Sequence, residues 1–269
     1  MPEAPSQSIT LDPQTRAVYQ HTLKLLRDAQ APFLVGGAYA FERYTGIARH
    51  TKDFDIFVRR EDYDDVAQVL ANAGYRTELT FPHWLGKAFS GEECIDIIFS
   101  SANGKARVDE AWFTHAVTTE VFEQPVSIIP AEEMILSKSF ILERERCDIA
   151  DVMHVLRAQA AQLDWPRLLE RFGAHWRVLL SHVVLFGFVY PDQRAQIPEE
   201  IVNKLIQRFQ EDLAAGPSDT QVCYGTLISR EQYLIDVHER GYQDGRQRPY
   251  GTLTAEEIAQ WTDSIGKIE

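Results

Sequence analysis

The sequence predicts an α/β fold, with a mixed sheet flanked by helices, followed by a mainly helical half. Short apolar runs bounded by charged and glycine residues fill the first half, whereas long stretches with helical spacing fill the second. Apolar residues make up 45% of the chain and charged residues 25%, which is ordinary for a globular protein. The pattern changes at Pro130. We therefore predict a domain over residues 1–129 and a mainly helical domain over 130–269, with a loop-rich segment from about residue 216.

In the first half, strand patterns alternate with short helical ones. Asp12 or Thr15 is a candidate cap for a helix to about residue 30. The apolar run 33–35 ends at Gly36-Gly37, which predicts a buried strand entering a tight turn. Further helices are expected over 38–44, stopped by Gly46, and 61–73. Further strands are expected over 54–58, 75–79, 84–89, 94–99 and 126–129, with residues 90–93 turning two of them into a hairpin.

The second half reads as a series of helices, several with proline in a first turn, where it is tolerated. They are expected over 131–144, 148–161, 166–172, 175–189 and 198–215. The most apolar segment, 178–190, is shorter than a membrane span and contains Ser181 and His182. We interpret it as a buried core helix and predict no membrane association. Because no signal peptide is visible at the N-terminus, we predict a cytoplasmic protein.

The charge balance and the cysteines restrict the classes of partner. The chain has 27 basic and 40 acidic side chains, a net charge of -13, which opposes loose binding of nucleic acid. Its three cysteines are odd in number and lack a CxxC pair, which argues against a disulfide framework or a zinc site.

Three aspartates carry the strongest chemical signal. On a strand over 54–58, Asp53 and Asp55 share one face, about 7 Å apart from twice the rise per residue. Asp96 stands in an apolar strand pattern, where an aspartate without a partner is costly. If the two strands are neighbours, the three carboxylates converge on one site. Oxygen ligands of this kind suit Mg²⁺, which also binds phosphate oxygens.

Gly36 and Gly37 lie between a predicted strand and a predicted helix start. Glycines there let backbone N–H groups approach a phosphate without a β-carbon in the way. A Gly-Gly pair alone is a weak signal, because it is common in turns. Together with the three aspartates it becomes much stronger.

These motifs resemble those of the polymerase-β-type nucleotidyltransferase superfamily. The resemblance rests on Gly36-Gly37, on the segment Arg49-His50-Thr51-Lys52-Asp53-Phe54-Asp55-Ile56, and on Ile95-Asp96-Ile97. The form of the motif is similar to the small bacterial branch, which includes antibiotic nucleotidyltransferases and the toxin half of some toxin–antitoxin pairs. The resemblance covers residues 30–100 and extends more faintly over 128–156.

The resemblance implies a reaction and a role for each motif residue. Asp53, Asp55 and Asp96 are expected to be catalytic and to hold two Mg²⁺ ions when substrate is bound. Residues expected to bind the nucleotide are Gly36, Gly37, Arg49, Thr51 and Lys138. An NTP such as ATP would give its nucleoside monophosphate to a hydroxyl acceptor with release of pyrophosphate. The acidic charge favours a small molecule or a protein over RNA as the acceptor.

Each candidate also has an ordinary structural interpretation. Asp53 and Asp55 could be surface carboxylates paired with Lys52 or Arg59, and Asp96 could form a buried salt bridge with an arginine. Arg49, Thr51 and Lys138 could be ordinary loop or surface residues. Asp148 and Asp151 share a helix face and could bind a metal or act as a base, although capping or pairing with Arg144 is the simpler role. The stretch 242–250 could line an acceptor site or a homodimer contact, or be a surface loop.

Two other classes of function compete with the enzyme. The first is a catalytically silent nucleotide-binding or regulatory protein with the same fold, against which the presence of all three aspartates argues. The second is a structural partner protein, which would leave an aspartate in an apolar strand unexplained.

Overall fold

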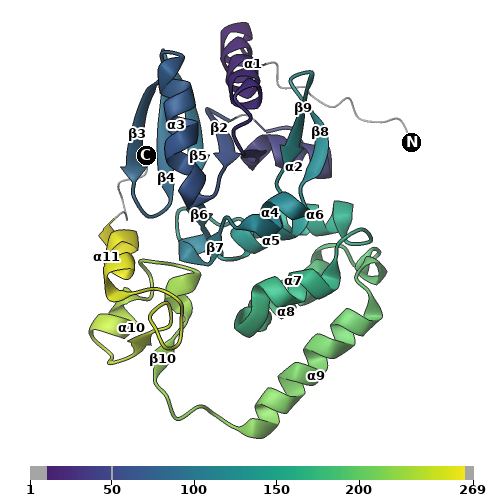
Figure 1. Ribbon diagram of the computed structural model, residues 1–269. Helices are drawn as coiled ribbons and strands as arrows, with labels where there is room; N and C mark the ends of the chain where they lie inside the picture. Colours follow the sequence, from purple (N-terminus) through teal and green to yellow (C-terminus); the bar gives the residue numbers. More distant parts are fainter. Residues whose placement is uncertain (1–10, 50, 264–269) are drawn as a thin grey trace. The chain divides into compact units, whose positions relative to one another are not determined.

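The computed structural model describes residues 11–49 and 51–263, which form two compact units. The first unit contains the chain up to Ser101 and Arg107–Pro130, and the second contains Ala102–Ala106 and the chain from Ala131 onward. Figure 1 shows the elements of both. His50, part of the aspartate motif, lies outside the described residues.

The first unit is built on a seven-stranded mixed sheet in the order β3-β4-β5-β2-β1-β9-β8. The strands are β1 (Leu34–Val35), β2 (Asp53–Phe57), β3 (Arg76–Phe81), β4 (Leu85–Ser90), β5 (Glu93–Ile98), β8 (Val117–Val121) and β9 (Gln124–Ile128). Its helices are α1 (Pro13–Asp28), α2 (Gly37–Thr45), the 3₁₀ turn η1 (Arg60–Asp62), α3 (Tyr63–Asn72) and α4 (Glu110–Thr114). A separate two-stranded ladder joins β6 (Ser100–Ser101) to β7 (Ala106–Arg107). This arrangement confirms the predicted mixed sheet with flanking helices.

One face of the sheet is covered by helices, and its alternating apolar residues form the core. Phe54, Ile56, Ile95 and Ile97 are fully buried. The ring of Tyr19 on α1 stacks on Phe54 with 4.9 Å between ring centroids. Helix α3 packs against β3 and β4 (Figure 1). Since side chains alternate along a strand, Asp53 and Asp55 on β2 and Asp96 on β5 point to the opposite face.

The local signals for turns and caps hold in the structure. The Asp12 carboxylate accepts hydrogen bonds from the backbone N–H groups of Gln14 and Thr15 and so caps α1. Gly46 ends α2 with φ 71°, a left-handed conformation that glycine adopts without strain. The hairpin between β4 and β5 turns at Gly91, as the sequence predicts.

The edge strand β8 was not predicted from the sequence. Its residues Val117, Thr118 and Glu120 are exposed, so the strand lacks the alternation between apolar and polar residues that marks a half-buried strand. It is held instead by its antiparallel pairing with β9.

The second unit is mainly helical. Its helices are α5 (Ala131–Ser139), α6 (Ile149–Gln159), α7 (Trp165–Phe172), α8 (Trp176–Val189), α9 (Glu199–Ala215), α10 (Leu234–His238) and α11 (Ala255–Asp263). Short 3₁₀ turns are η2 (Ala102–Gly104), η3 (Gly173–His175), η4 (Arg194–Gln196) and η5 (Gly225–Leu227), and β10 (Val222–Cys223) pairs with β11 (Gln243–Asp244).

Helix α5 is shorter than the predicted range 131–144. It ends at Ser139, and the backbone N–H of Leu142 donates to the carbonyl of Ile228 at 2.9 Å. Leu142 also forms a β-bridge with Cys147. The hydrogen bond with Ile228 and the bridge with Cys147 therefore outweigh the helical pattern of the local sequence.

The prediction of a buried core helix over 178–190 holds for one face only. Leu179 and Phe186 on α8 are fully buried, whereas Val184 is 67% and Phe188 81% exposed. Among the described residues, one helical stretch, Trp165–Val189, is long and apolar enough to cross a membrane. One such stretch is weak evidence, because core helices of soluble proteins meet the same criterion.

Candidate active site

Strand β2 places two aspartates on the face of the sheet opposite α1 and α3. Its start is fixed by Thr51, whose hydroxyl donates to the carbonyl of Asp53 at 3.1 Å and accepts from its N–H at 3.3 Å. Thr51 therefore positions the backbone of the first aspartate, as a turn-capping residue does. Arg49 is exposed, and its guanidinium lies over the ring of Phe41, 4.2 Å from the centroid.

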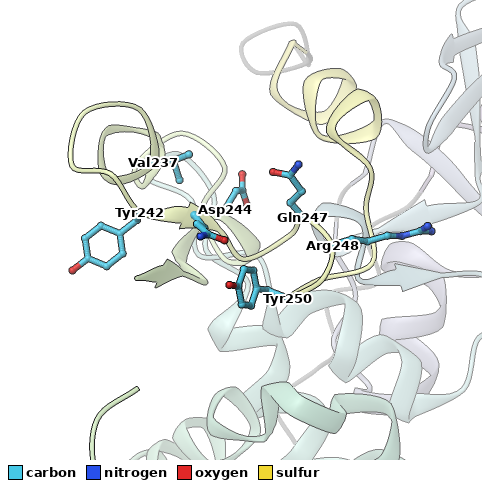
Figure 2. A pocket seen from close by; sticks show the side chains of 7 residues that line it. Val237, Tyr242, Asp244, Gln247, Arg248 and Tyr250 are labelled. Carbon is cyan, nitrogen blue, oxygen red and sulfur yellow. The ribbon is translucent and has the colours of Figure 1, made fainter. Parts of the chain in front are cut away.

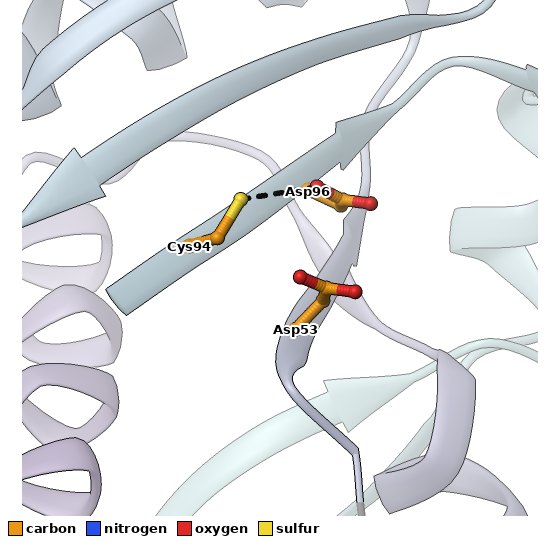
Figure 3. Close-up of side chains that lie close together, drawn as sticks. All are labelled: Asp53, Cys94 and Asp96. Atoms are coloured by element: carbon orange, nitrogen blue, oxygen red, sulfur yellow. Dashed lines mark hydrogen bonds between the residues drawn. The ribbon is translucent and has the colours of Figure 1, made fainter. Parts of the chain in front are cut away.

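Strand β5 runs parallel to β2 and brings Asp96 to the same site. The register pairs Asp53 with Cys94 and Asp55 with Asp96. Among the described residues, one group could surround a metal ion: ligand atoms of Asp53, Cys94 and Asp96 all lie within 4.8 Å of one another (Figure 3). Two aspartates that are 43 positions apart in the sequence thus meet at one place.

Asp55 has a different neighbour. Its carboxylate lies against Gly37, because a β-carbon added to Gly37 would be 1.7 Å from its Oδ2 atom. The backbone N–H of Gly36 donates to the carbonyl of Asp55 at 3.0 Å. The strand β2 and the Gly-Gly turn are therefore joined directly, with the carboxylate of Asp55 at the start of α2. The first N–H groups of a helix have no partner within that helix and can bind an anion.

The third member of the group, Cys94, is a neutral thiol. Burial raises its pKa to about 12, with the nearby Asp96 carboxylate adding to the effect. Its Sγ donates to Oδ1 of Asp96 at 3.4 Å. The charged donors in this group are therefore the carboxylate oxygens of Asp53 and Asp96, the type of ligand that Mg²⁺ prefers.

Asp96 is mostly buried, and its partner is a lysine. Lys87 on β4 places its Nζ 3.1 Å from Oδ1 of Asp96. Burial raises the pKa of Asp96, Lys87 opposes that shift, and the charge of Asp53 adds to it. The alternative of a buried salt bridge is thus correct in kind, although the cation is Lys87 and not an arginine. Arg59, which was the alternative partner for Asp53 and Asp55, pairs with Asp62 and Glu110.

The sequence motifs do not include Lys87 or Cys94, although the sequence holds a signal for Lys87. The predicted hairpin turns at residues 90–93, and pairing Ser90 with Glu93 sets Lys87 opposite Asp96. Counting residue pairs outward from a predicted hairpin turn identifies a basic residue that faces an aspartate on the neighbouring strand.

Lys138 forms a separate cluster in the second unit with Asp148, the residue before α6, and Asp151 on α6. Its Nζ lies 3.0 Å from Oδ2 of Asp148 and 2.7 Å from Oδ2 of Asp151. The Lys138 side chain is 16% exposed, so it is not a solvated surface lysine. Asp148 also pairs with Arg146 at 2.8 Å, and not with Arg144 as one alternative proposed. Whether Lys138 binds nucleotide stays a prediction.

The C-terminal stretch 242–250 lines a small cavity. Its volume is about 300 Å³, and it is bounded by Val237, Tyr242, Gln243, Asp244, Gln247, Arg248 and Tyr250. Figure 2 shows Tyr242 and Arg248 at opposite ends of the group. Asp244, one of the lining residues, forms a 2.7 Å ion pair with the buried Arg246. An acceptor role for this loop remains a prediction.

One prediction tests the contact between Gly37 and Asp55. Gly37→Ala should lower the rate of nucleotidyl transfer about 10- to 100-fold, because the new methyl group displaces the Asp55 carboxylate. Displacement of a charged catalytic group typically lowers the rate by about this factor. Gly46→Ala is the matched control, since Gly46 also has a positive φ, at the other end of α2, and no atom lies within 4 Å of its added β-carbon. Both variants should lose stability in thermal unfolding because of the positive φ, and Gly37→Ala should lose more because of its contact with Asp55. Equal activity in the two would contradict the positioning role of Gly37.

Comparison with solved structures gives distant similarities. The antibiotic-resistance factor ANT(2'')-Ia matches at 18% identity and a TM-score of 0.40, over 76% of this chain and 96% of the other. The lincosamide antibiotic adenylyltransferase LnuA matches at 17% identity and a TM-score of 0.37, over 53% of this chain and 95% of the other. An antigenic nucleotidyltransferase-like protein from Paracoccidioides brasiliensis matches at 13% identity and a TM-score of 0.42, over 69% of this chain and 92% of the other. Similarities this distant assign no substrate to the chain.

Comparison with curated proteins gives no match. A family model described as an uncharacterised nucleotidyltransferase matches residues 16–181, which is more than half of the chain and includes the sheet, the aspartates and the cluster around Lys138. The match confirms the prediction, made from the motifs, that the chain is a nucleotidyltransferase. This protein therefore belongs to that family of uncharacterised nucleotidyltransferases.

Proposed function

We propose that this nucleotidyltransferase moves a nucleoside monophosphate from an NTP, such as ATP, to a hydroxyl acceptor in a magnesium-dependent reaction. The observation that carries the proposal is the meeting of Asp53 and Asp96 beside the Gly-Gly turn that holds Asp55. Carboxylates gathered on one face of a sheet repel one another, and a divalent cation removes that cost. The donor set is oxygen, which suits Mg²⁺.

The chain's own groups have distinct roles in this proposal. Gly36 and Gly37 would leave room at the start of α2 for the β- and γ-phosphates, to whose oxygens backbone N–H groups of the first turn of α2 would donate. Asp53 and Asp55 would hold the cation at the triphosphate, and Asp96 would act near the attacking hydroxyl. Magnesium, when bound there, supplies positive charge that stabilises the attacking and leaving oxygens.

The bond changes balance without any further reactant. The acceptor oxygen forms a bond to the α-phosphorus, and the bond from that phosphorus to the bridging β-phosphate oxygen breaks. The acceptor proton goes to a base in the site or to water, and pyrophosphate leaves. Positioning and charge stabilisation provide most of the acceleration in such reactions.

The acceptor is proposed to be a small molecule or another protein. The nucleotidyltransferase itself is proposed to be cytoplasmic. The net charge of -13 repels the phosphates of RNA, which makes a polynucleotide acceptor the less favoured choice. The silent nucleotide-binding protein stays the second candidate, because a site that holds a cation and a triphosphate would also serve binding alone.

The test combines labelled NTPs, candidate acceptors and metal removal. Pyrophosphate release should require Mg²⁺, stop with excess chelator and return when Mg²⁺ is restored, because the cation holds the triphosphate. Release that persists in chelator would contradict magnesium dependence. Magnesium-dependent binding of NTP with no release in the presence of any alcohol, protein or RNA acceptor would favour the silent binder.

A further inference from the structure

Lys87 lies inside the candidate site, although neither the sequence motif nor the proposed reaction uses it. Strands β4 and β5 are antiparallel neighbours, and their register pairs Lys87 directly with Asp96. The Lys87 Nζ is 3.1 Å from Oδ1 of Asp96 and 3.9 Å from Sγ of Cys94. The two charged side chains are 25% and 14% exposed, so this is a half-buried ion pair and not a surface one.

The lysine remains charged in this position. The Asp96 carboxylate, 3.1 Å from the ammonium group, is an opposite charge that favours the charged form of the lysine. The site gathers three carboxylate side chains and one ammonium side chain. The Lys87 charge offsets part of the repulsion between the carboxylates, so that a single divalent cation is enough to offset the rest.

One side of Asp96 is already filled by donors. Its Oδ1 accepts from both Lys87 Nζ and Cys94 Sγ. Figure 3 shows the other carboxylate oxygen of Asp96 pointing away from Cys94. A second divalent cation on Asp96 would lie close to a fixed ammonium charge, and at contact distances two positive charges repel strongly in a partly buried site.

We propose that Lys87 takes the place of a second divalent ion, so that the site binds one cation per bound nucleotide and Lys87 positions Asp96. This inference rests on the proposed function and revises the two ions that the family resemblance implies. Lys87 is a positioning residue, because its ammonium group acts through the Asp96 carboxylate. It also keeps the acidic groups together before any cation arrives, by offsetting the repulsion between Asp53 and Asp96.

The test counts bound cations directly. Mn²⁺ replaces Mg²⁺ because free Mn²⁺ is visible by electron paramagnetic resonance, and α,β-methylene-ATP replaces ATP because it cannot be transferred. The wild-type protein, saturated with the analogue, should bind one Mn²⁺ per chain. Lys87→Met should bind two, since Asp96 is then free of its ammonium partner. Lys87→Arg keeps the charge and should again bind one.

Lys52→Met is the matched control, because Lys52 is exposed and lies next to Asp53 in the sequence. It removes the same charge from the same unit, and its count should stay at one. Two Mn²⁺ ions in the wild-type complex, or one in Lys87→Met, would overturn the inference while leaving the proposed reaction in place. A wild-type protein that binds no Mn²⁺ beyond what the free analogue binds would overturn the inference and the proposed function together.

Discussion

Asp53→Asn should abolish most nucleotidyl transfer, with a loss of about a thousandfold or more in kcat, without lowering the stability of the fold. A loss of roughly 4 kcal/mol in transition-state stabilisation corresponds to that factor, and a bound cation supplies several kcal/mol of this kind. Asp53 is the aspartate whose carboxylate meets Asp96 in the group that could surround an ion. An amide is a weaker cation ligand than a carboxylate and carries no charge.

The unchanged stability separates this result from unfolding. Burial raises the pKa of Asp96, and repulsion from the charge of Asp53 adds to that shift. Asparagine removes that repulsion, so the melting temperature without metal should be equal to that of the wild type or higher. Asp65→Asn, at an exposed position on α3, is the control and should leave both activity and melting temperature unchanged. The measurement is pyrophosphate release at saturating NTP, with thermal unfolding in chelator beside it. A variant that keeps more than a tenth of the wild-type rate would remove Asp53 from the catalytic set.

Glu133→Gln should destabilise the second unit by about 3 kcal/mol, since removing one member of a buried ion pair leaves uncompensated charge. The Glu133 side chain is fully buried on α5. Its Oε1 lies 2.9 Å from Arg167 and its Oε2 lies 3.0 Å from Arg171, both on α7. Arg167 also pairs with Glu132, so the network joins two glutamates of α5 to two arginines of α7.

The loss should appear in urea unfolding and in hydrogen exchange of the α5 and α7 backbone. Exchange localises the effect, because the sheet of the first unit should keep its protection. Glu170→Gln is the matched control, since Glu170 is an exposed glutamate on α7 and its replacement should change the free energy of unfolding by less than about 0.5 kcal/mol. Equal unfolding midpoints for Glu133→Gln and the wild type would mean that the buried network adds nothing to stability.

Local signals in the sequence determined many of the elements. The carboxylate of Asp12 satisfies the first N–H groups of α1, and Gly46 adopts the left-handed conformation that ends α2, so both boundaries are fixed by residues next to them. Helices α6 to α9 match their predicted ranges within about two residues, since helical spacing and proline position are also local properties. After α5, the backbone N–H of Leu142 bonds to the carbonyl of the distant residue Ile228 and not within a helix. The local pattern therefore predicts too long a helix there.

The sequence by itself determined the identity of the three aspartates, the Gly-Gly turn and the family to which they point. Only the tertiary structure decided how these residues meet. Strand β5 pairs in parallel with β2 after a helix and two other strands, and no local signal selects that neighbour. That pairing brings Asp96 to Asp53. Packing of α2 against β2 directs Asp55 to Gly37. The sequence specifies which residue types are present. The order of the strands decides which charged groups lie within a few ångströms of one another, and the free energy that favours this order comes from contacts across the whole sheet.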